Sequence, residues 1–326
     1  MVENYVLCAQ EIKMNVLITS IGATGSQNVI KALRKQVKYP VNIIGCDASV
    51  NNAGKFFVDK FYKLPFANDT TYIPTILDIC TKESVNLLIP IMEQELEVVA
   101  QNLIVLEKFN PVISELKIIE ICNDKSVCNP FIKALGINVP KEYDKLSDVK
   151  SFPVIIKPKK GTGSTNIIVV NDATQLASLS VDAPRYIIQD FIKGKEFTVD
   201  CYTSLVQDFC ECVPRERLIT KGGLCTQTKT VNNKELIDCS RKINKALKIK
   251  GPSNIQFIID ENTNVIYFIE INPRFGGAYI ASIEAGLNAP LFLLNEINKD
   301  KIEYSGFRVG LVMYRYWQEA YEYDMV

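Results

Sequence analysis

The first third of the chain alternates short apolar runs with longer amphipathic stretches. Short apolar runs are typical of buried strands, and apolar residues that recur every three or four positions are typical of helices that pack on a sheet. The expected strands are 15–19, 41–46 and 86–90, and the expected helices are 73–81, 95–107 and one that carries Val29, Ile30 and Leu33. Strands that alternate with helices predict a parallel, doubly wound sheet, which we place at residues 14–115.

The remainder of the chain, residues 116–326, has a different pattern that predicts a mixed α+β region. A helical stretch over 124–135 is expected to be interrupted near Pro130, because proline has no backbone N–H to donate. The strands that follow come in close succession, as in an antiparallel sheet. The expected strands are 153–157, 167–170, 186–191, 196–204, 209–217 and 224–231, with helices at 174–180 and 234–247.

The last pair of expected strands ends in polar residues. The segments 254–259 and 267–272 flank a link, 260–264, that is rich in turn-forming residues, so we expect a hairpin. Glu270 and Asn272 project from one face of this hairpin, because side chains alternate along a strand.

Two further residues extend this polar row. Gln256 lies beside Glu270 in the expected hairpin, and Arg274 continues the row if the strand geometry persists past Pro273. Carboxylate and amide oxygens are ligands that Mg²⁺ prefers, and a guanidinium suits a polyphosphate. The row therefore indicates a site for a metal–polyphosphate complex. The plainer alternative is an edge strand with a solvated polar end.

A second candidate site follows the strand 153–157. Lys157 ends this strand, and a loop that contains Gly161, Gly163 and Ser164 comes next. Free backbone amides in such a loop can bind phosphate oxygens, and the lysine can neutralise their charge. The order differs from a Walker A motif, in which the lysine follows the glycines. The plainer alternative is a hairpin turn with a solvated lysine.

The connector between the strands 186–191 and 196–204 is a candidate site for a flat base. Backbone N–H and C=O groups of such a connector can read the edge of a base, while apolar side chains cover its faces. Glu196 can accept hydrogen bonds from ribose hydroxyls. Taken alone, the segment is by default an ordinary polar loop.

Three further cations are candidate contacts for an anionic substrate. Lys125 begins a helix that Asp124 can cap, and Arg215 and Arg217 alternate along one face of a strand. Each of the three is equally compatible with ordinary surface charge.

The composition narrows the chemistry. The chain of 326 residues contains 37 Lys plus Arg and 37 Asp plus Glu, so its charge gives no reason to expect nucleic acid or a membrane surface as a partner. It contains no histidine, which excludes Ser-His-Asp and Cys-His mechanisms. Its 10 cysteines form no C-x-x-C pair, which argues against zinc and favours buried thiols in a reducing cytoplasm. We find no bilayer-spanning apolar run and no secretory signal.

A glycine-containing turn follows the first expected strand. Gly22-Ala23-Thr24-Gly25 occupies this turn, and Asp47 ends the second strand. The arrangement favours a dinucleotide site only weakly, because the third glycine of that fingerprint is missing. Three alternatives stay open: a nicotinamide-dependent oxidoreductase, a turn at Gly22–Ser26 that lines a small-substrate site together with Glu93, or a turn that only lets the following helix pack closely.

Taken in order, these segments resemble the ATP-grasp superfamily, and within it proteins like the large subunit of carbamoyl-phosphate synthase. The matching segments are Asn123-Asp124-Lys125, Ile155-Ile156-Lys157-Pro158 with Gly161–Ser164, Gln189-Asp190-Phe191-Ile192 with Gly194 and Glu196, Val213-Pro214-Arg215-Glu216-Arg217, Asn254-Ile255-Gln256-Phe257 and Ile269–Gly277. The resemblance implies a Rossmann-like pre-ATP-grasp domain at 14–115. It also implies a two-lobed ATP-grasp domain at 116–326, with its small lobe near 150–192.

The resemblance also implies a role for each matched residue. The residues implied to bind ATP are Lys125, Lys157, Gly161, Gly163, Ser164, Gln189, Phe191, Ile192 and Glu196. Those implied to bind Mg²⁺, or Mn²⁺ in its place, are Gln256, Glu270 and Asn272. The implied catalytic arginines are Arg274 and Arg215. Gln189 departs from the family, which often has an acidic residue there, but its amide oxygen can still accept a hydrogen bond from the adenine amino group.

The implied activity is the ATP-dependent joining of a small carboxylate to an amine. The reaction would pass through an acyl phosphate, release ADP and phosphate, and take place in the cytoplasm, with a homodimer as one option for the assembly. Two alternatives remain: activation of bicarbonate or carbamate, and a nucleotide-binding module without turnover.

Overall fold

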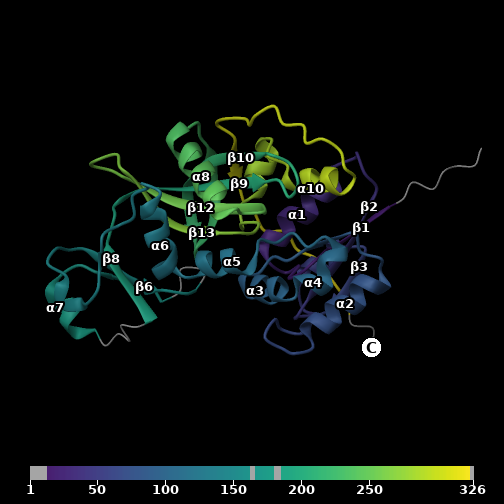
Figure 1. The fold of residues 1–326 in the computed structure, drawn as a ribbon, viewed down its shortest axis with the longest axis horizontal. Coiled ribbons are helices and arrows are strands. Elements are labelled where there is room, and N and C mark those ends of the chain that lie inside the picture. The colour runs from purple at the N-terminus through teal and green to yellow at the C-terminus, as the bar shows by residue number, and fades with distance from the viewer. Residues whose placement is uncertain (1–12, 162–165, 180–184, 324–326) are drawn as a thin grey trace, which may run out of the picture.

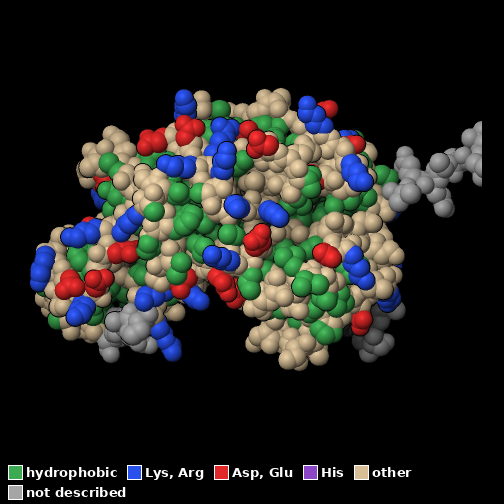
Figure 2. All heavy atoms as spheres, viewed as in Figure 1, with side chains coloured by type: hydrophobic (Ala, Val, Ile, Leu, Met, Phe, Trp, Pro, Cys, Tyr) green, Lys and Arg blue, Asp and Glu red, His purple; other side chains and the backbone are tan. Residues whose placement is uncertain are grey.

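The computed structural model describes residues 13–161, 166–179 and 185–323, whose strands form three separate sheets. In Figure 1 a parallel sheet lies at one end of the molecule, a small antiparallel sheet lies at the other end, and a six-stranded antiparallel sheet lies between them. Figure 2 shows the surface hollowed between the small lobe and the rest, with charged side chains on the walls. None of the helices in these ranges has the length and apolar character needed to cross a membrane.

The N-terminal sheet is parallel, with the strand order β3-β2-β1-β4. Its strands are β1 (Met14–Ile18), β2 (Val41–Asp47), β3 (Lys60–Lys63) and β4 (Leu87–Ile89). Its helices are α1 (Thr24–Lys35), η1 (Ala53–Phe57), α2 (Tyr72–Lys82), α3 (Glu93–Gln101), α4 (Leu103–Leu106) and η2 (Glu107–Phe109). Val16 and Ile18 pack in one core with α1, whereas Leu17 packs in another with α2 and α3. Helices thus cover both faces, which confirms the predicted doubly wound parallel sheet.

The helices between the N-terminal sheet and the rest differ from those expected. The helix predicted over 95–107 is divided into α3 and α4, because Asn102 leaves the helical conformation with φ −112° and ψ 23°. The next helix, α5 (Leu116–Asn123), was not predicted. The interruption predicted near Pro130 is wrong, since α6 (Lys125–Ala134) continues through it. Burial of Ile132 in the core under the large sheet offsets the backbone hydrogen bond that proline cannot make.

The large sheet is antiparallel, with the strand order β13-β12-β9-β10-β11-β14. Its strands are β9 (Gly194–Thr203), β10 (Cys210–Lys221), β11 (Leu224–Thr230), β12 (Gly251–Asp260), β13 (Ile266–Asn272) and β14 (Val312–Tyr314). Its helices are α8 (Lys234–Leu247), α9 (Ile280–Ala285) and α10 (Ala289–Ile297). One face packs on α6 and α8, and α9 and α10 pack on α1 of the N-terminal sheet. The predicted succession of antiparallel strands is confirmed.

The small sheet is also antiparallel, with the strand order β5-β8-β6-β7. Its elements are β5 (Glu142–Tyr143), η3 (Leu146–Asp148), β6 (Val154–Pro158), β7 (Ile168–Val170), α7 (Ala173–Ser178) and β8 (Tyr186–Asp190). The sheet has its own apolar core, which contains Val154, Ile156 and Ile188. The two-residue strand β5 was not predicted, because so short an edge strand leaves no periodic signal.

Side-chain caps fix where several helices begin. Asp124 accepts a hydrogen bond from the Ser126 backbone N–H at 2.9 Å and so starts α6 at Lys125. Asn233 caps α8 in the same way at 3.0 Å, and Asn288 caps α10 at 3.2 Å. Such caps satisfy backbone donors that have no partner inside the helix. The cap on α6 places Lys125, one of the predicted ATP-binding residues, at the first position of that helix.

A buried ion pair fastens α9 to the middle of the large sheet. Arg215 of β10 donates to Asp200 of β9 at 2.7 and 3.3 Å, and the two side chains are 2% and 0% exposed. The Ser282 hydroxyl of α9 donates to the same carboxylate at 2.7 Å. A buried charge is tolerated only when it is paired and hydrogen-bonded.

Asp200→Asn should therefore destabilise the fold by roughly 3–5 kcal/mol, because it leaves the Arg215 charge buried without a counter-charge. Urea unfolding of the two proteins measures this difference. The matched control is Glu211→Gln. Glu211 lies in β10, as Arg215 does, and forms a partly exposed ion pair with Arg241 of α8, so its loss should cost at most about 1 kcal/mol. Equal losses in the two variants would contradict a special role for the buried pair.

Candidate active site

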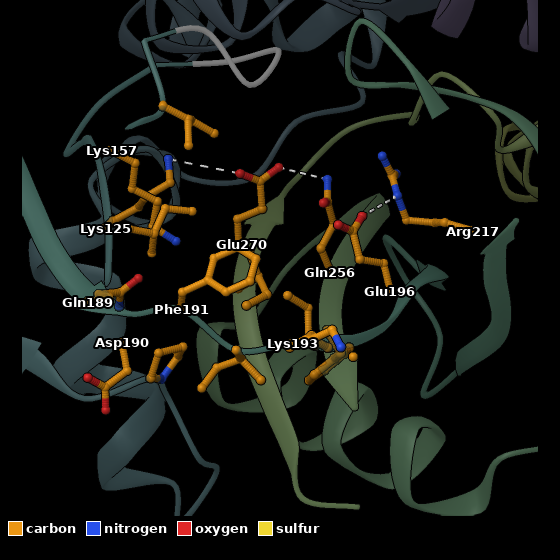
Figure 3. A pocket seen from close by; sticks show the side chains of 18 of the residues that line it. Lys125, Lys157, Gln189, Asp190, Phe191, Lys193, Glu196, Arg217, Gln256 and Glu270 are labelled. Atoms are coloured by element: carbon orange, nitrogen blue, oxygen red, sulfur yellow. Dashed lines mark hydrogen bonds and ion pairs between the residues drawn. The ribbon is translucent and has the colours of Figure 1, made fainter. Parts of the chain in front are cut away.

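A cavity of about 280 Å³ lies between the small sheet and the large sheet. Figure 3 shows the charged and polar side chains that face it. The predicted ATP-binding residues that line it are Lys125, Lys157, Gly161, Gln189, Phe191, Ile192 and Glu196. The predicted metal ligands Gln256 and Glu270 line it as well. Gly163 and Ser164 lie outside the described residues.

One end of the cavity is cationic. The Lys125 ammonium lies 3.9 Å from a Glu270 carboxylate oxygen and 3.5 Å from the Gly161 carbonyl oxygen. Lys157, the penultimate residue of β6, is 6% exposed and makes neither an ion pair nor a side-chain hydrogen bond within the described residues. Burial lowers the pKa of Lys157 to about 8, Glu270 opposes this shift, and Lys125 adds to it. The cavity thus holds a lysine whose charge has no direct partner in the part of the chain that the structure describes.

The other end of the cavity has apolar walls and one buried amide. Ile155, Phe191 and Ile258 contribute apolar surface, and the Gln189 side chain is only 1% exposed. The Gln189 amide nitrogen donates to Glu142 of β5 at 3.0 Å, while its carbonyl oxygen is buried and has no hydrogen-bond partner among the residues that the structure describes. Apolar faces with a single oriented polar group are typical of sites for flat heterocycles.

An ion pair separates this cavity from a second one. Arg217 donates to Glu196 at 3.1 Å and to the Gly223 carbonyl at 3.0 Å. Its side chain is 9% exposed, whereas that of Glu196 is 50% exposed. Glu196 is therefore accessible to a hydroxyl-bearing ligand, and Arg217 forms a fixed wall.

The predicted hairpin of β12 and β13 is confirmed, and it pairs Gln256 directly with Glu270. One Glu270 oxygen accepts from the Gln256 amide at 2.8 Å and from the Asn272 amide at 3.3 Å. β13 is an edge strand, as in the plainer alternative. Its Glu270 nevertheless lines the cavity and is only 30% exposed, so this end is not an open solvated edge.

The prediction that strand geometry continues to Arg274 is wrong. β13 ends at Asn272, and the chain turns there, with the Arg274 N–H donating to the Asn272 carbonyl at 2.9 Å. The turn carries the guanidinium into a smaller cavity of about 130 Å³. There it donates at 2.5 Å to Glu93, the first residue of α3.

The two cavities share three wall residues: Arg217, Gln256 and Glu270. Asn272 lines the smaller cavity with Arg274 and Glu93. An elongated ligand in the larger cavity would therefore have its end at the polar row, beside whatever the smaller cavity holds.

The polar row is a poor metal site by itself and a suitable one for a metal–phosphate complex. Among the described residues, no group of three His, Cys, Asp or Glu side chains is placed to hold a metal. Glu270 supplies one negative charge, and Gln256 and Asn272 supply neutral amide oxygens. Most of the charge that a divalent cation needs would have to come from the ligand's phosphates.

Arg215 lies deeper than a simple anion contact requires. It lines the smaller cavity, but its guanidinium is paired with Asp200, and its Nη1 is buried with no partner in the described ranges of the chain. Its predicted catalytic role stays a prediction. Thr198 and Asn254, also in this wall, were not predicted as site residues, because nothing short-range marks one polar residue in a strand as facing a cavity.

The glycine turn after β1 and Glu93, which were predicted to line one substrate site together, differ in their distance from the cavities. The Gly22 N–H donates to Asp47 at 2.9 Å, and no residue of Gly22–Ser26 is among the described residues that line either cavity. Only Glu93 reaches the smaller cavity.

Lys157→Met should stabilise the protein by about 3 kcal/mol at pH 7, since the pKa of this lysine falls from 10.5 to about 8 on folding. Below pH 8 the lysine is charged in both the folded and the unfolded state, and burial of this charge destabilises the folded state. Between pH 8 and 10.5 the folded state releases its proton first, so the native protein gains stability and the advantage of the variant shrinks. Urea unfolding at pH 7, 8.5 and 10 measures this.

The exposed Lys160→Met is the matched control for this substitution and should leave the pH dependence unchanged. A Lys157→Met advantage that stays constant from pH 7 to 10 would contradict the assignment of the lowered pKa to this lysine.

Comparison with known protein families divides the chain into two regions. Residues 122–278 match the ATP-grasp domain family, and residues 16–110 match the PylC-like N-terminal domain family. The first region contains the polar row and both walls of the larger cavity; the second contains the parallel sheet and Glu93.

Individual proteins are similar over parts of the chain. D-alanine–D-alanine ligase of Fusobacterium nucleatum is 26% identical over 167 residues, which are 48% of this chain and 58% of that protein. Carbamoyl phosphate synthase large chain of Pyrobaculum aerophilum is 23% identical over 313 residues, 88% of this chain but 30% of the synthase chain.

Among solved structures, the fold is similar to the biotin carboxylase domain of Hydrogenobacter thermophilus 2-oxoglutarate carboxylase. The TM-score is 0.72 at 15% identity, covering 90% of this chain and 72% of that one. The expected architecture is therefore confirmed, and the chain belongs to the ATP-grasp superfamily, with a PylC-like N-terminal domain ahead of its ATP-grasp domain.

Proposed function

We propose that the protein is an ATP-dependent ligase that activates a carboxylate as an acyl phosphate and transfers the acyl group to an amine. The observation that carries this proposal is the junction of the two cavities at Gln256 and Glu270. A nucleotide in the larger cavity would place its terminal phosphate at this junction. A small acid in the smaller cavity would then lie next to it.

The larger cavity has a suitable group for each part of ATP. The apolar walls near Phe191 and the free Gln189 oxygen suit adenine, and the accessible Glu196 suits ribose hydroxyls. Lys125 and Lys157 suit the phosphates, which would supply the counter-charge that Lys157 lacks. Phosphate binding would raise the pKa of this lysine back toward its ordinary value, because a nearby negative charge favours the protonated form.

Glu270, Gln256 and Asn272 are the residues that would hold Mg²⁺ bound with the nucleotide. In the structure both amides donate to Glu270, which keeps its carboxylate ordered on the cavity wall. The metal ion, when bound, would neutralise phosphate charge during transfer. Mn²⁺ offers the same preference for oxygen ligands and is an alternative to test.

The proposed reaction has two steps. A carboxylate oxygen of the acid attacks the γ-phosphorus, and the bond from that phosphorus to the β,γ-bridging oxygen breaks, giving an acyl phosphate and ADP. The amine nitrogen then attacks the acyl carbon, phosphate leaves with the C–O bonding electrons, and the nitrogen loses a proton. Arg274 is the cation best placed to stabilise charge on the transferred group, because it lies in the smaller cavity beside Asn272.

Bicarbonate or carbamate is a second candidate substrate. The smaller cavity has a volume of only about 130 Å³, which suits an acid with few atoms. A nucleotide-binding module without turnover is less well supported, since the smaller cavity and its Arg274 have no evident use in nucleotide binding alone.

Nucleotide binding is the first test. Mg²⁺ with ADP should raise the melting temperature, because a ligand that binds only the folded state stabilises it. NADH should have no such effect. A shift with NADH and none with MgADP at millimolar concentration would overturn the proposal. A phosphate-release screen of carboxylates, including bicarbonate, paired with amines would then identify the substrates.

Glu270→Gln is the sharpest test of the polar row. It keeps the shape of the side chain and removes the only negative charge in the row, so ADP formation should fall by at least about two orders of magnitude. Asn272→Ala should cost less, since water can replace a neutral ligand. The matched control is Glu261→Gln. Glu261 lies in the turn after β12, and its exposed carboxylate pairs with Lys193. Near-normal activity of Glu270→Gln would reduce the row to a structural feature.

A further inference from the structure

A carboxylate on the shortest strand of the small sheet accepts hydrogen bonds from two buried side-chain amides. Glu142 of β5 lies directly opposite Gln189 of β8 in the strand register. One Glu142 oxygen accepts from the Gln189 amide nitrogen at 3.0 Å and from the Asn129 amide nitrogen of α6 at 2.5 Å. The carbonyl oxygens of both amides are buried and have no partner in the described part of the chain.

This arrangement fixes which way the Gln189 amide points. If the amide turned over, its oxygen would face the partly buried Glu142 carboxylate, acceptor against acceptor, and the Gln189 side chain is only 1% exposed. The nitrogen is therefore held on Glu142, and the oxygen is left for a ligand. Figure 3 shows the amide oxygen of Gln189 on the side of Lys125 and Lys157, away from Asp190.

We infer that Glu142 is a positioning residue that makes the larger cavity select a 6-amino purine over a 6-oxo purine. The inference rests on the proposed binding of ATP and adds a determinant of base specificity. An exocyclic amino group donates to the free Gln189 oxygen. A 6-oxo group presents an acceptor to that same oxygen and is rejected, because two buried acceptors cannot satisfy each other.

The groups around Glu142 do not give the same selectivity. Lys157 interacts electrostatically with Glu142, but it lies at the cationic end of the cavity, where it would affect all nucleotides alike. Tyr143, the other residue of β5, donates to Asp190 at 2.7 Å rather than to Gln189. Among the described residues, the carboxylate of Glu142 is the one acceptor for the amide nitrogen of Gln189.

The test compares the binding of MgADP and MgIDP by calorimetry, since these ligands differ only in the base, at position 6 and the adjacent N1 proton. The native protein should bind MgADP at least about tenfold more tightly. Glu142→Met removes the acceptor that orients the amide, so Gln189 can turn its nitrogen toward a 6-oxo group. The ratio should then fall about tenfold, mainly through tighter MgIDP binding.

A double variant supplies the rescue. In Glu142→Gln with Gln189→Glu the donor and acceptor are exchanged: the new amide donates to the new carboxylate, whose second oxygen accepts from the amino group. Preference for MgADP should return. Tyr143→Phe is the matched control on the same strand; it loses a hydrogen bond to β8 and should keep the native ratio.

The outcomes separate this inference from the proposed function. If the native protein binds neither nucleotide, the proposed function fails, and the inference fails with it. If MgADP binds but the native protein does not discriminate, or if Glu142→Met keeps the native ratio, the inference alone is overturned. Should Glu142→Met fail to fold, the double variant decides: loss of discrimination there overturns the inference.

Discussion

The cleft between the two antiparallel sheets must hold positive charge without its ligand, and this constraint governs much of the structure. Buried cations are stable only with counter-charges, and each of the three arginines that line the two cavities has its own carboxylate. The pairs are Arg215–Asp200, Arg217–Glu196, Arg274–Glu93 and, at the longer distance of 3.9 Å, Lys125–Glu270. Lys157 is the exception: burial lowers its pKa, and no carboxylate among the described residues lies close enough to pair with it.

Pairing also explains how a strongly charged site can coexist with a stable fold. The carboxylates that neutralise the cations here are in part the groups assigned to ribose and metal, Glu196 and Glu270. A bound nucleotide with its metal would exchange partners with these pairs, so that phosphates take the lysines and the carboxylates are released to their ligands. The Arg215–Asp200 pair is different, because it is almost fully buried and also anchors Ser282, so it serves the fold first.

Local patterns predicted many of the elements, though not α5 or β5, and several site residues, but not their long-range partners. The hairpin that pairs Gln256 with Glu270 followed from two strands and a turn, and α8 followed from helical periodicity. The position of Arg274 could not be predicted, because it depends on a turn after Asn272 and on Glu93, 181 residues away in sequence. Glu142 could not be predicted for the same reason: its contact with Gln189 depends on the pairing of β5 with β8.

The glycine turn of the first domain is explained by a long-range packing contact, although its local sequence weakly favours a dinucleotide site. A Cβ on Gly25 would lie 3.1 Å from the Phe275 carbonyl oxygen, and one on Gly277 would lie 2.8 Å from the Thr24 hydroxyl. Asn28 of α1 donates to the Gly276 carbonyl at 2.9 Å. Glycines on both sides thus let α1 pack directly against the loop after β13. Because that loop carries Arg274, the N-terminal domain helps to hold one wall of the smaller cavity, and close packing accounts for these glycines without a dinucleotide.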